Sequence, residues 1–346
     1  MTEQTAQARN QLVQLVFGQM AGKVLATGAQ LGLADLLGDA ERSGTELAAA
    51  TGTNAGALTR LLRALAALDI VTETSPGTFR LTDTGALLRT DRPDSVAAFV
   101  RMFSDPAMLA AWVELEGAVR TGETTFDKIF GVGFFEHLSG DLELSALFNA
   151  SMRQGTRMTA ALLPAHYDFG RFHTVADVGG GDGTLIAEVL RANPALRGII
   201  YDTAEGLAQA DATLTAAGVA DRCATRAGDF FTAAPAGADL YLLKSVLHDW
   251  DDDRAATILG HCRQVIPEHG RLLIVEPVLP PVVDGTLPPT MYLSDLNMLV
   301  NLGGRERTRA DFEQLCERAG FTVTEIHPLP APAVFSLIEA TPSGNP

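Results

Sequence analysis

Residues 10–38 carry apolar side chains at helical spacing, which predicts a long helix near the start of the chain. The apolar positions extend beyond one face of this helix and include Leu12, Leu15, Val16, Met20, Val24, Leu31, Leu36 and Leu37. A helix that is apolar over most of its circumference has to be buried on several sides. The pattern leaves two partners open: the rest of its own domain, or a second chain.

The next segment has the pattern of a winged helix. A short helix is expected after Ser43 or Thr45, with a turn at Gly52, and a second helix follows. The strands "IVTE" and "TFRLT" flank a Ser-Pro-Gly turn, which predicts a hairpin. The second helix places five leucines on one face: Leu58, Leu61, Leu62, Leu65 and Leu68. We therefore expect a winged-helix-like domain over residues 1–100.

Helical patterns also fill the centre of the chain. Residues 108–122 and 143–164 are expected to be helices, with a loop at 123–141 between them and Pro164 ending the second helix. These helices are interpreted as a linker at the start of a second domain, residues 101–346.

From about residue 173 short apolar runs alternate with helical patterns. Such alternation predicts an α/β domain with a mostly parallel sheet covered by helices on both faces. The last two strands have no helix between them, which indicates an antiparallel edge. The expected strands are 173–179, 196–202, 223–230, 238–244, 270–280, 322–329 and 333–341.

Charge and composition narrow the function. The chain has 346 residues, a net charge of −16 and a pI of about 4.8. A winged helix is a DNA-binding pattern, but the second helix carries only Arg60 and Arg63 on this acidic chain. A DNA-binding regulator with an adenosine effector therefore stays open as the weaker alternative, and we expect no nucleic-acid partner.

The cysteines and the start of the chain point to the cytoplasm. Cys223, Cys262 and Cys316 lie far apart, without the spacing of a zinc site or a disulfide framework. The start "MTEQTAQARNQ" is polar, and no apolar run is long enough to span a membrane. We expect no signal peptide, no membrane contact and a reducing compartment.

A glycine-rich turn and two acids end the first strands of the predicted sheet. "ADVGGGDGT" places Gly179, Gly181 and Gly183 in a G-x-G-x-G pattern, and no phosphate-binding lysine follows. Asp202 ends the second strand, where an acid can accept hydrogen bonds from ribose hydroxyls. Asp229 and Phe230 end the third strand and suit the amino group and ring of adenine. The three strand ends predict an adenosine-binding site.

Five motifs in order give the chain a family resemblance. "DVGGGDG", "GDFF", "LLKSVLHDW", "VEP" and "NLGGRERT" resemble the S-adenosylmethionine-dependent O-methyltransferases of the caffeic-acid type and their bacterial natural-product relatives. The resemblance covers nearly the whole chain. It implies a class I methyltransferase sheet behind an N-terminal dimerisation domain, a homodimer, a small aromatic acceptor, S-adenosylmethionine as cofactor and no metal.

The resemblance also implies site residues. His248 would be the general base, flanked and oriented by Glu276 and Glu306. The cofactor would be held by Gly179, Gly181, Asp202, Asp229, Phe230, Lys244 and Trp250. The acceptor pocket would be lined by Met152, Met298, Asn301 and Phe103, the last at a position where plant members tend to carry a polar residue.

The chemistry explains these residue types. The sulfonium methyl is already activated, so the enzyme has to align three atoms and remove the proton of a phenol with a pKa of about 10. A histidine can accept that proton, with a carboxylate on its other ring nitrogen to fix the tautomer. N- or C-methylation, decarboxylation and hydroxylation on the same scaffold stay open. Asp249 receives no role, and Asp251 and Asp252 are expected to cap the next helix.

Overall fold

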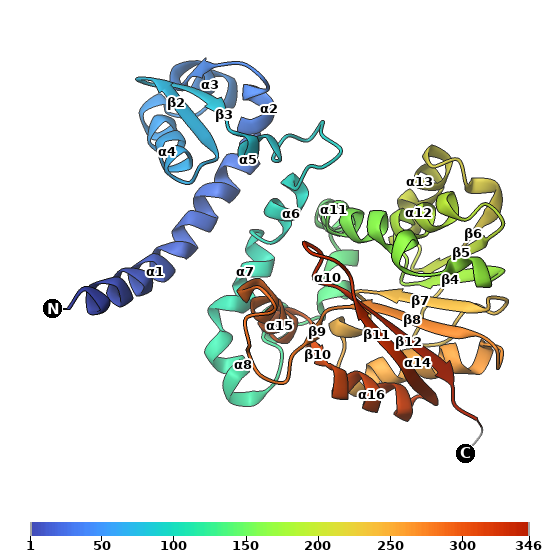
Figure 1. Ribbon diagram of the computed structural model, residues 1–346. Helices are drawn as coiled ribbons and strands as arrows, with labels where there is room; N and C mark the ends of the chain where they lie inside the picture. The colour runs from blue at the N-terminus through green and yellow to red at the C-terminus, as the bar shows by residue number, and fades with distance from the viewer. Residues whose placement is uncertain (1, 345–346) are drawn as a thin grey trace. The chain divides into compact units, whose positions relative to one another are not determined.

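The computed structural model describes residues 2–344, and the chain forms two compact units. The first unit comprises Met1–Leu109 and Ala150–Gln154, and the second comprises Ala110–Asn149 and Gly155–Pro346. α7 (Pro106–Val113) and α11 (Leu142–His166) run through both units. Figure 1 labels the elements of each unit.

The first unit has the predicted winged-helix pattern. α3 begins behind a capping box, in which the Ser43 side chain accepts from the Glu46 N–H and the Glu46 carboxylate accepts from the Ser43 N–H. Gly52 ends the helix with a φ of +65°. The hairpin of β2 and β3 is antiparallel, as expected. The elements are α1 (Glu3–Gln30), α2 (Leu33–Leu37), β1 (Arg42–Ser43), α3 (Gly44–Thr51), α4 (Ala55–Ala67), β2 (Val71–Ser75), β3 (Thr78–Leu81), α5 (Asp83–Ala86) and α6 (Ala97–Met102).

One leucine of the predicted apolar face is not buried. Leu58, Leu62 and Leu65 lie in the core of the first unit with Phe79 and Leu47. Leu68 is 41% exposed. α4 ends at Ala67, so Leu68 leaves the helical path and the extension of the face to this residue was wrong.

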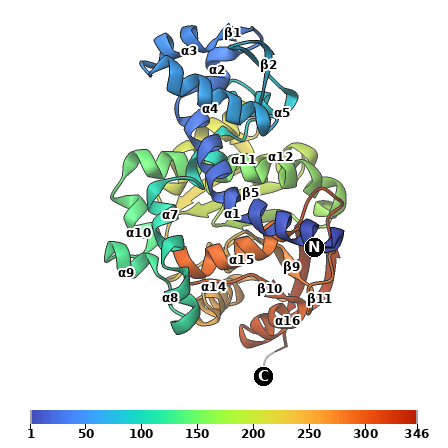
Figure 2. The ribbon, with the colours of Figure 1, turned by 90° about the vertical axis from the view of Figure 1, so that its left-hand side faces the viewer.

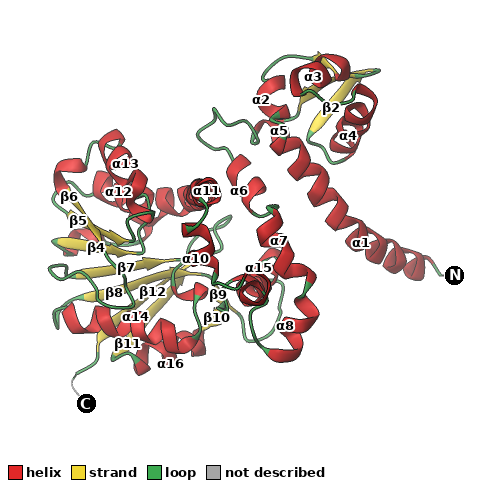
Figure 3. Cartoon of the chain, turned by 180° about the vertical axis from the view of Figure 1, so that it is seen from behind, coloured by secondary structure: helices red, strands yellow, loops and turns green. Residues whose placement is uncertain are grey.

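The first half of α1 has exposed apolar side chains in the single chain. Figure 3 shows this helix extending away from α2, α3 and α4. Its exposed large apolar side chains are those of Leu12, Val13, Leu15, Val16, Phe17 and Met20. The sequence pattern left open whether the helix is buried by its own domain or by a second chain. Its own domain does not cover these side chains.

A seven-stranded sheet forms the centre of the second unit. Its order is β11-β12-β8-β7-β4-β5-β6. β12 is antiparallel to both of its neighbours, β11 and β8, which confirms the predicted antiparallel edge. The strands β8, β7, β4, β5 and β6 run parallel to one another. The strands are β4 (Thr174–Val178), β5 (Arg197–Asp202), β6 (Cys223–Ala227), β7 (Leu240–Lys244), β8 (Arg271–Glu276), β11 (Phe321–Pro328) and β12 (Ser336–Pro342).

Alternate residues of the strands face two apolar layers. Tyr241 and Leu243 of β7 pack with helices α14 (Asp252–Val265) and α16 (Arg309–Arg318). Leu240 and Leu242 pack with α11, α12 (Thr184–Ala192) and α13 (Ala210–Ala216) on the opposite face (Figure 1). The period of two along a strand explains why both faces can be apolar. Single turns of 3-10 helix complete the unit at η1 (Phe169–Arg171), η2 (Gly206–Gln209), η3 (Ala220–Arg222) and η4 (Leu247–Asp249).

The centre of the chain is more helical than predicted. The expected loop 123–141 contains α9 (Phe126–Phe130) and α10 (Phe134–Ser139), because Phe126, Phe134 and Leu138 bury their side chains there. The first predicted helix is broken at Glu114 into α7 and α8 (Leu115–Thr121). Pro164 does not end α11 but lies in its last turn, where the missing N–H removes one bond only.

A further helix, α15 (Pro289–Asn301), was not predicted and lies beside β9 (Val278–Leu279) and β10 (Arg307–Thr308) (Figure 2). It contacts α8 and α9. Within residues 2–344, no helix combines the length and the apolarity that a membrane crossing requires.

Candidate active site

The loop that carries His248 follows β7 directly. Ser245 has a φ of +53°, unusual for a residue with a side chain, and turns the chain sharply. The backbone N–H groups of Val246, Leu247 and His248 then converge on one oxygen of Glu276, at 3.1, 2.7 and 3.2 Å. Successive N–H groups in a tight turn form a site for a negative charge. We call residues 245–250 the His248 loop.

The imidazole of His248 lies between two carboxylates. Its Nδ1 is 3.1 Å from Oε1 of Glu306, and its Nε2 is 3.5 Å from Oδ1 of Asp249. Burial lowers the pKa of His248, but the charges of Asp249 and Glu306 and the Glu306 hydrogen bond outweigh burial and raise it to about 10. The two carboxylates therefore favour the protonated form of the ring.

The two glutamates predicted to orient His248 reach it differently. Glu306 contacts the ring, and it is held by Ser294, whose Oγ donates to it at 3.1 Å, and by Asp295, which accepts from its N–H at 2.8 Å. Glu276 instead binds the backbone of the loop, including the N–H of His248 itself. Burial raises the pKa of Glu276. Of the two glutamates, therefore, only Glu306 contacts the imidazole ring itself.

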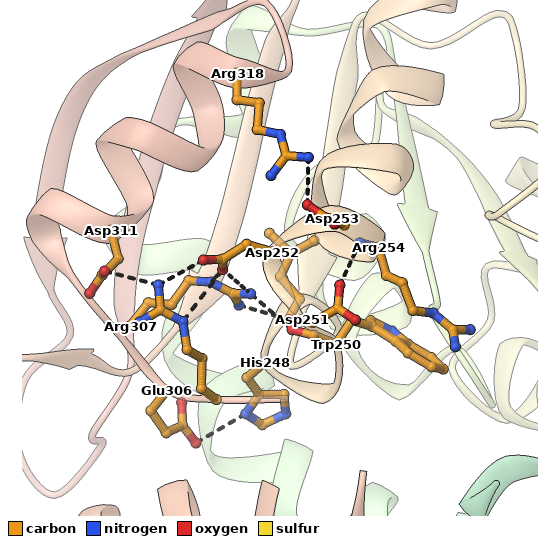
Figure 4. A network of polar contacts seen from close by, with 12 residues as sticks. His248, Trp250, Asp251, Asp252, Asp253, Arg254, Glu306, Arg307, Asp311 and Arg318 are labelled. Carbon is orange, nitrogen blue, oxygen red and sulfur yellow. Dashed lines mark hydrogen bonds and ion pairs between the residues drawn. The ribbon is translucent and has the colours of Figure 1, made fainter. Parts of the chain in front are cut away.

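The acids after His248 divide into three kinds. Asp249, to which the sequence assigned no role, faces the His248 ring, and burial raises its pKa to about 7. Asp251 caps α14 by accepting from the Arg254 N–H at 2.8 Å, as predicted. The same prediction was wrong for Asp252, whose carboxylate binds Arg305 and Arg307 at 2.9 Å (Figure 4). Asp252 differs from its neighbour Asp251 because its partners, Arg305 and Arg307, are distant in sequence.

The glycine loop, residues 179–183, requires its glycines. Gly179, Gly181 and Gly183 have φ values of +75°, +55° and +76°, a region that favours glycine. A Cβ on Gly179 would lie 2.7 Å from Val246 Cγ2, so this loop packs directly on the His248 loop. At Gly181 nothing lies within 4 Å of the corresponding position. The loop thus offers open backbone at the carboxyl end of β4.

The predicted adenosine-binding residues gather at the same edge of the sheet. Asp202 accepts from the Gly181 N–H at 2.8 Å and from the Thr203 N–H at 2.7 Å, and burial raises its pKa. Asp229 accepts from the Phe231 N–H at 2.8 Å. These carboxylates are thus fixed by backbone N–H groups.

Two further cofactor candidates are partly buried: Lys244 directly before the His248 loop and Trp250 at its end. Lys244 donates to Thr156 at 3.2 Å and lies 4.8 Å from the Phe335 ring centroid; burial lowers its pKa to about 8. Trp250 has the Phe135 ring at 5.3 Å and the Arg254 guanidinium at 4.2 Å. Its Nε1 is buried without a hydrogen-bond partner among the described residues.

These features fit an adenosine-bearing cofactor. The open backbone at Gly181 allows close approach, and the buried Nε1 of Trp250 leaves a donor unused. A Cβ on Gly179 would lie 3.7 Å from the Phe230 ring, so an aromatic surface borders the loop. Among residues 2–344, no group of three or more His, Cys, Asp or Glu residues could hold a metal ion.

The predicted acceptor residues fall into both units. Met298 and Asn301 are buried on α15. The Asn301 amide donates to Asn297 Oδ1 at 2.9 Å, which also accepts from Trp112 Nε1 at 2.9 Å. Met152 and Phe103 belong to the first unit. Lining of an acceptor pocket by these residues stays a prediction.

Sequence reasoning missed Arg307, whose side chain is completely buried beneath the His248 loop (Figure 4). A buried arginine requires paired acceptors, but neither its spacing nor its neighbours identify them. The only available signal was its place next to Glu306.

Comparison with known proteins agrees with this geometry. The family model of the O-methyltransferase domain matches residues 112–322, and that of the O-methyltransferase dimerisation domain matches residues 13–91. The chain is 48% identical over 337 residues to the O-demethylpuromycin-O-methyltransferase of Streptomyces alboniger, covering 97% of this chain and 89% of that protein.

Solved structures show the same relationship. The mitomycin 7-O-methyltransferase MmcR has a TM-score of 0.92 and 34% identity, covering 99% of this chain and 100% of that chain. NcsB1, an O-methyltransferase from neocarzinostatin biosynthesis solved with S-adenosylmethionine and 2-hydroxy-5-methyl naphthoic acid, has a TM-score of 0.80 and 32% identity, with 93% and 95% covered. This chain therefore belongs to the O-methyltransferase family with an N-terminal dimerisation domain, and it is an S-adenosylmethionine-dependent O-methyltransferase.

Proposed function

We propose that the enzyme transfers a methyl group to a phenolic hydroxyl of an aromatic natural-product intermediate, with His248 as general base. The observation that supports this proposal most directly is the His248 ring between Glu306 and Asp249, at the same edge of the sheet as the glycine loop. The named relatives add support, because they include enzymes acting in antibiotic biosynthesis.

Proton removal is the task of the His248 loop. The bound cofactor supplies a methyl group on a positively charged sulfur. With Nδ1–H donating to Glu306, the unprotonated Nε2 can accept the phenolic proton, and Glu306 stabilises the imidazolium that results. A phenol has a pKa of about 10, and the raised pKa of His248 makes its neutral imidazole a stronger base toward such an acceptor. Asp249 lies close enough to Nε2 to stabilise the same charge.

The proposal is tested by product analysis. The purified enzyme is incubated with S-adenosylmethionine and either O-demethylpuromycin or 2,7-dihydroxy-5-methyl-1-naphthoate, acceptors taken from the names of two relatives. A product one methyl group heavier, with the methyl on oxygen by NMR, is expected for at least one acceptor. Methyl transfer to nitrogen or carbon would favour the other chemistries that the scaffold allows.

We further propose that Asp202 binds the cofactor ribose. Asp202→Asn is expected to weaken S-adenosylhomocysteine binding by about tenfold or more, because the variant loses a charged acceptor that also fixes the Gly181 N–H. Calorimetric titration measures this effect. Asp211→Asn, at an exposed position on α13, is the matched control and should bind normally. Equal affinity in both variants would remove Asp202 from the ribose site.

We propose a homodimer whose interface includes the exposed face of α1. This helix begins before the matched dimerisation domain, and all its exposed apolar side chains except Leu12, which directly precedes the matched residues, lie within that domain. The double variant Leu12→Glu with Val16→Glu is expected to raise the dimer dissociation constant by at least about 10²-fold, since each buried side chain contributes about 1.5–3 kcal/mol. Analytical ultracentrifugation measures it.

The control for this variant keeps the charge change and spares the apolar face. Gln11→Glu with Gln14→Glu adds the same two charges at exposed polar positions of α1 and should leave the dimer intact. Dissociation in both variants would show a charge effect only.

DNA binding remains the weaker alternative, because Arg63 of α4 is paired with Glu73 at 2.9 Å. The cytoplasm remains the predicted compartment.

A further inference from the structure

Arg307 donates hydrogen bonds to two backbone carbonyl groups of the His248 loop. Its Nη1 donates to the Leu247 carbonyl at 2.8 Å and its Nη2 to the Trp250 carbonyl at 2.9 Å. Its Nε and Nη2 also bind Oδ1 of Asp252, at 3.0 and 2.9 Å. Figure 4 shows Arg307 beside Asp252 and Trp250. The two carbonyls stand on either side of His248 in the chain, so one rigid planar group fixes both ends of the turn.

The N–H end of the turn is held by a negative charge, the carboxylate of Glu276. Glu276 accepts from the N–H groups of Val246, Leu247 and His248, as described above. The turn η4 is a single 3-10 turn, and such a turn has little stability of its own. A carboxylate at the N–H end and a guanidinium at the carbonyl end both match the direction of its peptide dipoles.

Arg307 also follows Glu306 in the chain. Glu306 contacts the imidazole, and Arg307 contacts the backbone that carries the imidazole. Any shift of the loop relative to Arg307 therefore changes the distance from Nδ1 to Glu306. Both contacts come from the adjacent residues Glu306 and Arg307. The position of the ring against Glu306 therefore depends on how Arg307 holds the loop.

We propose that Arg307 is a positioning residue for methyl transfer, which holds the His248 loop so that the imidazole stays against Glu306. The inference rests on the proposed function, because Arg307 acts through His248. Arg307→Lys keeps the charge, but a single ammonium group cannot reach both carbonyls and Asp252 with the geometry of a guanidinium. The ring is expected to move away from Glu306 in this variant.

The test reads the ring itself. Protein labelled with 15N-histidine is titrated by NMR, and the His248 signals are assigned by their loss in His248→Gln. The groups that face or influence the ring are Asp249 in its own loop, Glu306, Glu276 from β8 and Lys244 from β7, all unchanged in the variant. A weaker Glu306 contact in Arg307→Lys should lower the pKa of His248 by about one unit.

The matched control is Arg305→Met. Arg305 binds the same Asp252, at 2.9 Å, but makes no hydrogen bond to the carbonyls of the loop. His248 should titrate in this control as in the wild type. Turnover with O-demethylpuromycin provides a second measure: kcat should fall about tenfold in Arg307→Lys, while KM for S-adenosylmethionine stays within about twofold of the wild-type value. A loss of structure alone would change both constants.

Unchanged titration of His248 in folded Arg307→Lys, or equal shifts in Arg307→Lys and Arg305→Met, overturns the inference. If Arg307→Lys does not fold, Asp252→Asn replaces it, because it loosens the anchor of Arg307 at a position 44% exposed. A lower His248 pKa than in Arg305→Met supports the inference, and identical titrations overturn it.

Failure of the proposed function gives a different result. Full activity of His248→Ala would refute the general base, whereas the titrations would still decide whether Arg307 positions the ring.

Discussion

His248→Ala is expected to lower kcat for methyl transfer by about 10²- to 10³-fold, which is the usual contribution of a positioned general base. The reason is that a phenol is a poor nucleophile until it loses its proton. His248 is the only histidine in the loop after β7, so its removal takes away the ring nitrogen that would accept this proton. S-adenosylhomocysteine should bind His248→Ala with an unchanged dissociation constant, because the substitution leaves all the candidate cofactor residues in place, including Lys244 and Trp250 on either side of His248.

The control is a histidine of no proposed role. His269 is exposed in the turn before β8, at the amino end of that strand, and His269→Ala should have wild-type kcat. Calorimetry and turnover with the same acceptor are measured for both variants. Wild-type turnover of His248→Ala with an authentic acceptor would show that the ring does not take the proton.

The pH profile gives a second test of the same prediction. The base is the neutral imidazole, and its fraction grows as pH rises toward a pKa of about 10. The value of kcat/KM should therefore increase from pH 7 to pH 9, and this rise should disappear in His248→Ala. Asp249→Asn removes a negative charge that raises this pKa, so the rise should occur at lower pH in that variant. A rise that persists in His248→Ala would belong to another group.

Periodicity predicted the sheet well because its signal is local. Apart from the mostly exposed edge strand β6, each parallel strand is a short, largely apolar run followed or ended by a polar or glycine residue. The ends of β4, β5 and β7, and the residues just after β6, carry the residues that the sequence selected. Parallel strands bring such ends to one edge. The predicted adenosine-binding residues are therefore near one another without any knowledge of the loops.

Other features depend on tertiary contacts, and the sequence could not predict them. The segment 123–141 looks irregular, but buried aromatic residues such as Phe126 and Phe134 stabilise helices there. The choice of Glu306 over Glu276 as the ring partner depends on how the segment before β10 crosses the loop after β7. Asp251 and Asp252 are adjacent and chemically alike, yet only the second meets two arginines.

Gly304→Ala is expected to reduce kcat by about 10²-fold or more, through displacement of the His248 loop. Gly304 has no unusual φ, so the backbone of the variant is unstrained in itself. A Cβ at this position would instead lie 2.0 Å from the His248 carbonyl oxygen, 2.4 Å from the Asp249 carbonyl carbon and 2.6 Å from the Trp250 nitrogen. Carbon atoms in contact are normally about 3.5–4.0 Å apart.

All three clashes are with backbone atoms, so no side-chain rotation can relieve them. Either the segment 303–306 or the His248 loop has to retreat by about an ångström, and both movements separate the imidazole from Glu306. The overpacking should also lower the free energy of unfolding by about 1–3 kcal/mol. Turnover, S-adenosylhomocysteine titration and thermal unfolding measure the three effects.

Gly260→Ala separates the local clash from the general effect of adding a methyl group. Gly260 lies within α14, and a Cβ there would meet nothing within 4 Å. This variant should keep wild-type kcat and gain about 0.5–1 kcal/mol of stability from the better helix former. If Gly304→Ala turns over like Gly260→Ala, the close packing on the His248 loop does not control the reaction. If kcat falls while S-adenosylhomocysteine still binds, the distance between His248 and Glu306 is what the added methyl group has changed.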